Sequence, residues 1–78
     1  MKARDKSIRY HEHALQRMKE RGIEKSMIEK ALRAPDLVRD AKRDDAKRYE
    51  KSISKRRKIV VIASQDRDSF WVISAWRT

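Results

Sequence analysis

The sequence predicts an α+β fold in which two N-terminal helices pack on one face of a three- or four-stranded antiparallel sheet. Two observations support this fold class. Apolar residues recur at helical spacing before Pro35, and from Leu37 onward they follow the alternating or continuous patterns of strands. With 78 residues and no repeat or linker, the chain is expected to form a single domain, residues 1–78.

The first helix is expected to run from a cap at Ser7 to about Arg21. Gly22 is the only glycine in the chain, and it follows at the position where a left-handed residue ends a helix. One apolar arc of this helix is formed by Ile8, His11, Leu15 and Met18. Because His11 falls on that arc, we expect it to be a packed core residue rather than a catalytic group.

A second helix is predicted from about Lys25 to Arg33, because Pro35 cannot continue a helix. Its buried stripe would be formed by Ile23, Met27, Ile28, Ala31 and Leu32. Since Gly22 separates the two helices, they are expected to form an αα-hairpin or corner.

Four later segments have strand character: residues 37–40, 47–53, 58–64 and 70–77. The first is short and weak, whereas the third is rich in β-branched residues and is expected to be central. Polar turns are predicted around Arg43, Asp44 and Asp45, and over residues 66–69. Between the second and third strands, residues 54–58 predict a basic hairpin turn that carries Arg56 and Arg57.

Residues 70–77, the last predicted strand, determine which aromatic side chains lie on the sheet face away from the helices. Alternate residues point to opposite faces, so one set must pack under the helices. If the set with Phe70 packs there, Trp71 and Arg77 line the other face; in the reverse case, Trp76 and Ser74 do. Either arrangement places a stacking surface beside basic strands, which suits single-stranded nucleic acid. The alternative is that both tryptophans belong to the core.

The charge distribution favours a polyanionic partner. Lys and Arg total 22 against 12 Asp and Glu, and the segments 1–23 and 37–58 hold the whole excess of +10. Such a field attracts RNA through counterion release, although an acidic protein would also be attracted. No helix combines a wide apolar face with aromatic anchors, so no membrane partner is expected. Without cysteine, a long apolar run or a signal-peptide pattern, the protein is expected to be cytoplasmic.

His13, Arg17 and Arg21 are spaced four residues apart, which places them on one helical row. A histidine beside two permanent cations suits phosphate binding or phosphodiester cleavage, although a solvated basic helix face has the same spacing. His11 and His13 point away from each other and the acidic residues form no cluster. We therefore expect no metal and no cofactor.

Metal-independent cleavage of RNA needs a base, an acid and cations that stabilise charge on phosphorus. His13 could serve as the base or the acid. The charge could be stabilised by Arg17, Arg21, Arg48 or Arg77.

Several motifs together resemble a family of short bacterial and archaeal proteins of unknown function that is placed beside toxins of the BrnT and RelE type. They are the run His13-Ala14-x-x-Arg17-Met18-x-x-Arg21-Gly22-Ile23, the pairs Pro35-Asp36 and Arg48-Tyr49, and the Val-rich hairpin. The ending Val72-Ile73-Ser74-Ala75-Trp76-Arg77 is similar to the closing strand of BrnT toxins. The resemblance extends over nearly the whole chain.

The resemblance implies a RelE-like fold and an endoribonuclease that acts as the toxin of a toxin–antitoxin pair, cutting RNA by attack of the 2′-hydroxyl on the phosphate. The expected partners are RNA, including mRNA on the ribosome, and an acidic antitoxin protein. The expected catalytic residues are His13, Arg17, Arg48 and Arg77. The expected RNA-binding residues are Arg21, Tyr49, Lys51, Arg56, Arg57 and Trp76. Two alternatives stay open: a non-catalytic toxin of the same fold that inhibits a protein target, and a basic RNA- or DNA-binding module.

Overall fold

A computed structural model describes residues 6–41 and 45–78 of the chain. Its elements are β1 (Ser7–Tyr10), α1 (Glu12–Arg21), α2 (Lys25–Arg33), β2 (Leu37–Asp40), β3 (Ala46–Ser54), β4 (Arg57–Gln65) and β5 (Ser69–Arg77). The second helix and the four predicted strands therefore lie where the sequence placed them, with bounds that differ by one residue at most. Of the turn predicted at positions 43–45, Arg43 and Asp44 lie outside the described residues.

The sheet has five strands in the order β1-β5-β4-β3-β2, and it is mixed. β1 pairs with β5 in parallel, whereas the other neighbours are antiparallel. The prediction of a three- or four-stranded antiparallel sheet was therefore wrong, although the fold remains α+β. The additional strand comes from the segment that was expected to begin the first helix.

The segment Ser7–Tyr10 alternates polar and apolar residues, which is the period of a strand. Ile8 and Tyr10 pack against the core, while Ser7 and Arg9 are exposed. The same residues also fit one arc of a helix. They form a strand because the edge of β5 offers backbone groups with which they can pair. Because Ile8 lies opposite Phe70 and Tyr10 opposite Val72, the segment extends the sheet instead of starting α1.

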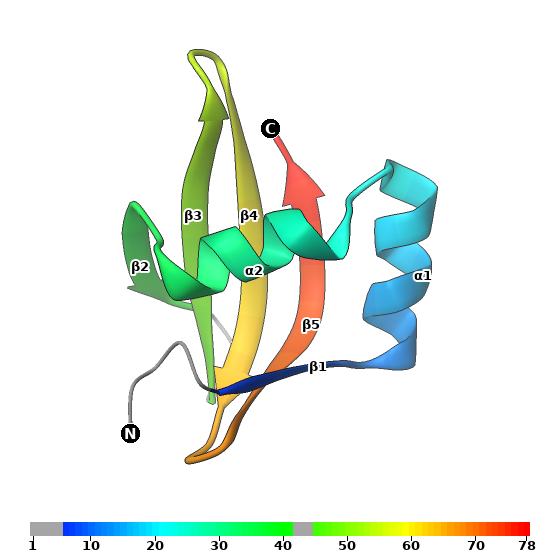
Figure 1. Ribbon diagram of the computed structural model, residues 1–78, viewed down its shortest axis with the longest axis vertical. Helices are drawn as coiled ribbons and strands as arrows, with labels where there is room; N and C mark the ends of the chain where they lie inside the picture. The colour runs from blue at the N-terminus through cyan, green and yellow to red at the C-terminus, as the bar shows by residue number, and fades with distance from the viewer. Residues whose placement is uncertain (1–5, 42–44) are drawn as a thin grey trace.

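The two helices do not share one sheet face in the way the sequence suggested. Figure 1 shows α2 crossing the face of β3, β4 and β5, whereas α1 stands beside β5, beyond the end of β1. Between them Gly22 adopts the left-handed conformation with φ of 67°, so its predicted role at the end of α1 is confirmed. Within residues 6–41 and 45–78, no helix covers the opposite sheet face.

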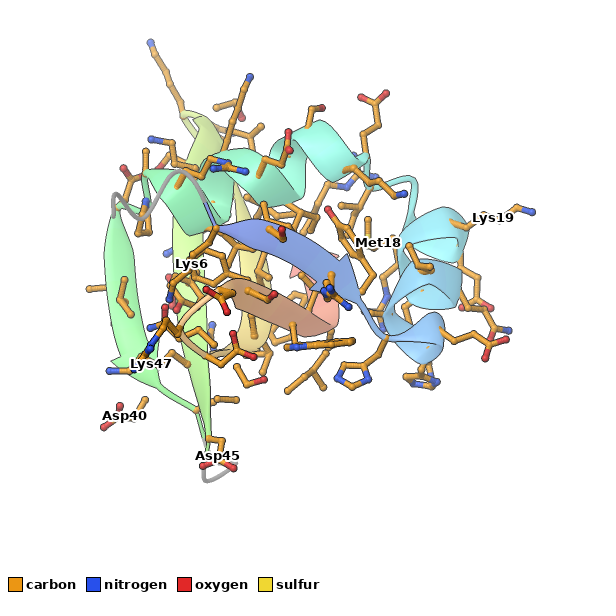
Figure 2. The ribbon with its side chains drawn as sticks, turned by 60° about the horizontal axis from the view of Figure 1, so that its bottom comes forward. Lys6, Met18, Lys19, Asp40, Asp45 and Lys47 are labelled. Atoms are coloured by element: carbon orange, nitrogen blue, oxygen red, sulfur yellow. The ribbon has the colours of Figure 1, made fainter. Side chains whose placement is uncertain are left out.

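The core lies between α2, α1 and the sheet. Ile28, Ala31 and Leu32 of α2 are buried on the sheet, as the apolar stripe predicted. α1 contributes Ala14 and Met18, and Figure 2 shows Met18 on the inner side of this helix and Lys19 on its outer side. The sheet contributes Tyr49, Ile59, Val61, Ala63, Phe70, Val72 and Ala75.

An irregularity in β5 changes which residues share a face. Ala63 pairs with Val72, but the preceding residue of β4, Ile62, pairs with Ser74, so Ile73 is an extra residue in β5. After this bulge, the alternation of β5 side chains between the two sheet faces is therefore shifted by one residue. Val72 and Ala75 both enter the core, and Trp71 and Trp76 both lie on the opposite face. Neither of the two predicted arrangements of the tryptophans was right.

Candidate nucleic-acid interface

The sheet face opposite α2 is rich in cations and aromatic rings, and we call it the open face. Strand register places on it Arg9, Arg39, Arg48, Glu50, Lys58, Val60, Ile62, Trp71, Ser74 and Trp76. The tryptophans are half-buried, whereas Val60, which lies opposite Trp76 on β4, is fully buried. The face thus combines an apolar floor with basic side chains, which is the combination that binds unpaired bases and their phosphates.

The centre of the open face is a hollow of about 450 Å³. Arg39 and Arg48 lie directly opposite each other on β2 and β3, and both line it. The Arg48 guanidinium lies 5.6 Å from the ring centroid of Trp76, which forms another wall. The remaining lining comes from Asp40, Ala41, Ile62, Ile73 and Ser74.

Glu50 is the one carboxylate directly bonded to cations of the open face among the residues described. Its oxygens accept hydrogen bonds from Arg48 Nε at 2.9 Å and Lys58 Nζ at 3.1 Å, and its side chain is 6% exposed. The hydrogen bond from Lys58, with the charges of Lys58, Arg48 and Arg39, holds the pKa of Glu50 below its ordinary value despite burial. Glu50 is therefore ionised near neutral pH.

Trp76 also lines a second hollow, of about 490 Å³, together with Arg21 and Arg77. Hydrogen bonds from these two arginines connect α1 with β5. Arg21 Nη1 donates to the Ala75 carbonyl at 2.8 Å, and Arg77 Nη2 donates to the Arg21 carbonyl at 2.9 Å. Each guanidinium keeps further N–H groups for another acceptor. Four guanidiniums from helix and sheet therefore surround one indole.

The structure does not bring the remaining predicted site residues to this place. His13 and Arg17 are exposed on α1 and line neither hollow. Tyr49 is 4% exposed and packs edge-on against Phe70 in the core, where burial raises its pKa. It therefore cannot contact RNA on the open face, which corrects the role that the resemblance implied.

Three further predicted RNA-binding residues lie away from both hollows. Lys51 pairs with Asp36 at 3.6 Å. Arg56 and Arg57 are exposed at the β3–β4 turn and at the start of β4. These cations can add to the field around the protein, but they do not form a binding pocket.

The sequence reasoning missed three residues of the open face, whose contacts depend on strand register, and His11 beside it. Arg39 lay in a strand that was considered weak, and its position opposite Arg48 depends on strand register. Glu50 and Lys58 were placed on strands, but their contact also depends on register. His11, expected in the core, is exposed at the start of α1, with its ring centroid 5.2 Å from that of Trp71.

Residues 6–41 and 45–78 contain neither a metal-binding cluster nor a membrane-spanning helix. These residues contain no group of three or more His, Cys, Asp or Glu side chains suited to a metal ion. Neither of the helices in this part of the chain has the length and apolar character needed to span a membrane.

Comparison with known proteins places the chain in a family without giving a function. Residues 10–77 match the family model described as domain of unknown function DUF4258, so the chain belongs to this family. No curated protein and no solved structure matches the chain. The function must therefore be inferred from the geometry of the site.

Proposed function

We propose that this member of the DUF4258 family binds single-stranded RNA on its open face, with the hollow around Arg39, Arg48 and Trp76 as the main site. One observation carries the proposal: Arg39 and Arg48 lie directly opposite each other on neighbouring strands, and both line one hollow with the half-buried indole of Trp76. Like charges in this position destabilise a sheet. Glu50 offsets part of the repulsion through its bond to Arg48, and a phosphate bound between the two arginines would offset more of it. The indole would stack the neighbouring base.

A solvated basic surface explains less of the structure. It would account for exposed cations such as Arg56 and Arg57 at the tip of the β3–β4 hairpin. It gives no reason for two tryptophans on a sheet face that neither α1 nor α2 covers. Duplex RNA also fits poorly, because its bases are stacked on one another and cannot stack on a protein ring.

The test is fluorescence anisotropy with a labelled single-stranded RNA, using Trp76→Ala and a control, Leu15→Ala. Leu15 is 39% exposed on α1 and lines neither hollow. Losing one base stack costs about 1–3 kcal/mol, so Trp76→Ala should weaken binding about 5- to 150-fold. The control should bind as the wild type does. Equal affinities for the two variants, each shown to be folded by circular dichroism, would contradict the proposal.

Cleavage of the bound RNA is a second candidate function, and the Glu50 site favours it. Glu50 carries an ionised carboxylate directly beside the Arg48 guanidinium. Arg48 and Lys58 would first turn from Glu50 toward the phosphate, which would expose the carboxylate. The 2′-hydroxyl proton would then pass to Glu50 while the 2′-oxygen forms a bond to phosphorus and the bond to the 5′-oxygen breaks. The leaving oxygen would take a proton from the Lys58 ammonium, and Arg48 would stabilise the charge on phosphorus.

Glu50→Gln and His13→Ala distinguish two possible general bases in a nuclease assay. Glutamine keeps an oxygen that accepts hydrogen bonds but loses the negative charge, so RNA binding should be retained or tightened while cleavage is lost. Loss of cleavage only in His13→Ala would instead place the base on α1. Absence of cleavage in the wild type, or cleavage that survives both substitutions, would exclude these assignments.

A toxin role is a further part of this proposal, and it is supported by the resemblance to BrnT- and RelE-type toxins and by the net charge of +10. It implies a cytoplasmic protein held inactive by an acidic antitoxin that covers the basic surface. Induced expression should then arrest growth, and Arg48→Ala should relieve the arrest at equal protein level. Growth arrest without RNA degradation would favour inhibition of a protein target instead.

A further inference from the structure

A second cluster of rings and cations lies on the open face near the start of β5. Trp71 of β5 lies opposite Arg9 of β1, whose guanidinium is 5.5 Å from the indole ring centroid. The His11 imidazole is 5.2 Å from Trp71, centroid to centroid, with an angle of 43° between the rings. Among the described residues, the side chains of Arg9 and His11 form no salt bridge or hydrogen bond.

The bulge at Ile73 places this cluster on the same face as Trp76. With about 3.3 Å per strand residue, the two tryptophans are roughly 15 Å apart along β5. Ile73 and Ser74 lie between them and line the main hollow. The path along β5 is therefore uncharged, with a ring and an arginine at each end. Such a spacing exceeds the size of one nucleotide.

We propose that Trp71, His11 and Arg9 form a second stacking subsite for the same RNA strand whose other base stacks on Trp76. The strand runs along β5 across the open face. His11 and Trp71 offer ring surfaces to a base, and Arg9 offers a planar cation for stacking or for a phosphate contact. This inference rests on the proposed function and adds to it a minimum strand length and a direction.

One carboxylate, Asp66, lies close enough to Arg9 to feel its charge, but it is not bonded to the guanidinium. Asp66 lies in the β4–β5 turn, where the charge of Arg9 contributes to its lowered pKa. The largest causes of that lowering are hydrogen bonds from the backbone N–H groups of Asp68 and Ser69. One Asp66 oxygen is thus held by the turn itself rather than by the Arg9 side chain, which leaves the guanidinium available to RNA.

The two tryptophans, the only ones in the sequence, make the subsites separately observable. In Trp76→Phe the fluorescence comes from Trp71 alone, and in Trp71→Phe it comes from Trp76 alone. Both variants are titrated with uridine oligonucleotides of two and eight residues. We expect the eight-residue strand to quench both indoles with one dissociation constant and a stoichiometry of one strand per protein.

A charge-matched pair completes the test. Arg9→Ala and Lys30→Ala each remove one cation, and Lys30 is exposed on α2, which covers the opposite face. Arg9→Ala should weaken binding of the eight-residue strand about fivefold or more while leaving quenching of Trp76 by the two-residue strand unchanged. Lys30→Ala should change both affinities by less.

The outcomes separate this inference from the proposed function. If Trp76 is quenched but Trp71 is not, or if Arg9→Ala binds the longer strand as Lys30→Ala does, the second subsite is wrong and the main site stands. Two strands per protein with different dissociation constants would also overturn a shared path. If neither indole responds to RNA, both proposals fail.

Discussion

The salt dependence of RNA binding measures how many cations contact phosphate, and Arg39→Ala changes that number by one. Each phosphate contact to single-stranded nucleic acid contributes about −0.7 to the slope of log affinity against log salt concentration. The four guanidiniums around Trp76 belong to Arg39, Arg48, Arg21 and Arg77. If each contacts one phosphate, the wild-type slope is about −2.8 and the variant slope about −2.1.

These slopes predict a large and measurable difference. Between 50 and 500 mM salt the wild type should lose about 600-fold in affinity, whereas Arg39→Ala should lose about 130-fold. Arg39 is suited to this substitution because it is exposed and makes no ion pair within the described residues, so the fold should tolerate alanine. Fluorescence anisotropy with a single-stranded RNA at four or five salt concentrations gives both slopes.

Lys30→Ala provides the control, because it removes the same charge from α2. If Lys30 contacts no phosphate, the slope of log affinity against log salt concentration for this variant should equal that of the wild type. If Arg39→Ala and Lys30→Ala show the same slope, the protein attracts RNA through a diffuse field, and the hollow between Arg39 and Arg48 has no special role.

Three further predictions concern stability and are measured by urea unfolding. Gly22→Ala should cost about 1–2 kcal/mol through the left-handed backbone alone, since an added Cβ meets nothing closer than Arg77 Nη2 at 3.7 Å; an unchanged midpoint would contradict this. Ile28→Ala should cost about 2–5 kcal/mol because Ile28 is fully buried on the inner side of α2, whereas exposed Leu15→Ala should cost less than about 0.5 kcal/mol; similar losses would refute the assigned core. The pKa of Glu50 is lowered on folding from 4.5, so its stabilising effect is complete above pH 4.5 and is lost as pH falls through the folded value. Glu50→Gln should flatten the acid side of the stability profile, and an equally steep profile would contradict the Lys58 contact.

Local patterns predicted the helices and strands where one structure alone fits the sequence. Pro35 and the stripe around Ile28 define α2 without reference to the rest of the chain. The segment Ser7–Tyr10 is different, because its alternation fits both a strand and a helical arc. Its structure is decided by pairing with residues more than sixty positions away, which no local pattern contains.

The composition of the candidate site was predicted only in part. The sequence indicated a sheet face that carries basic side chains and tryptophan, and Arg48 and Trp76 do meet on the open face. A single extra residue, Ile73, places Trp71 on the same face, and simple alternation cannot anticipate a bulge. Contacts such as Lys58 with Glu50 depend on cross-strand register, which the sequence does not specify.

The most direct test is a titration of isotope-labelled protein with single-stranded RNA, followed by amide and indole N–H signals in two-dimensional NMR spectra. Binding on the open face predicts that the Trp76 indole signal and the backbone signals of Arg48, Ile62 and Ser74 shift, while those of Lys30 and its neighbours on α2 do not. Shifts concentrated on α2 or at the β3–β4 turn, with both indole signals unchanged, would contradict RNA binding on the open face.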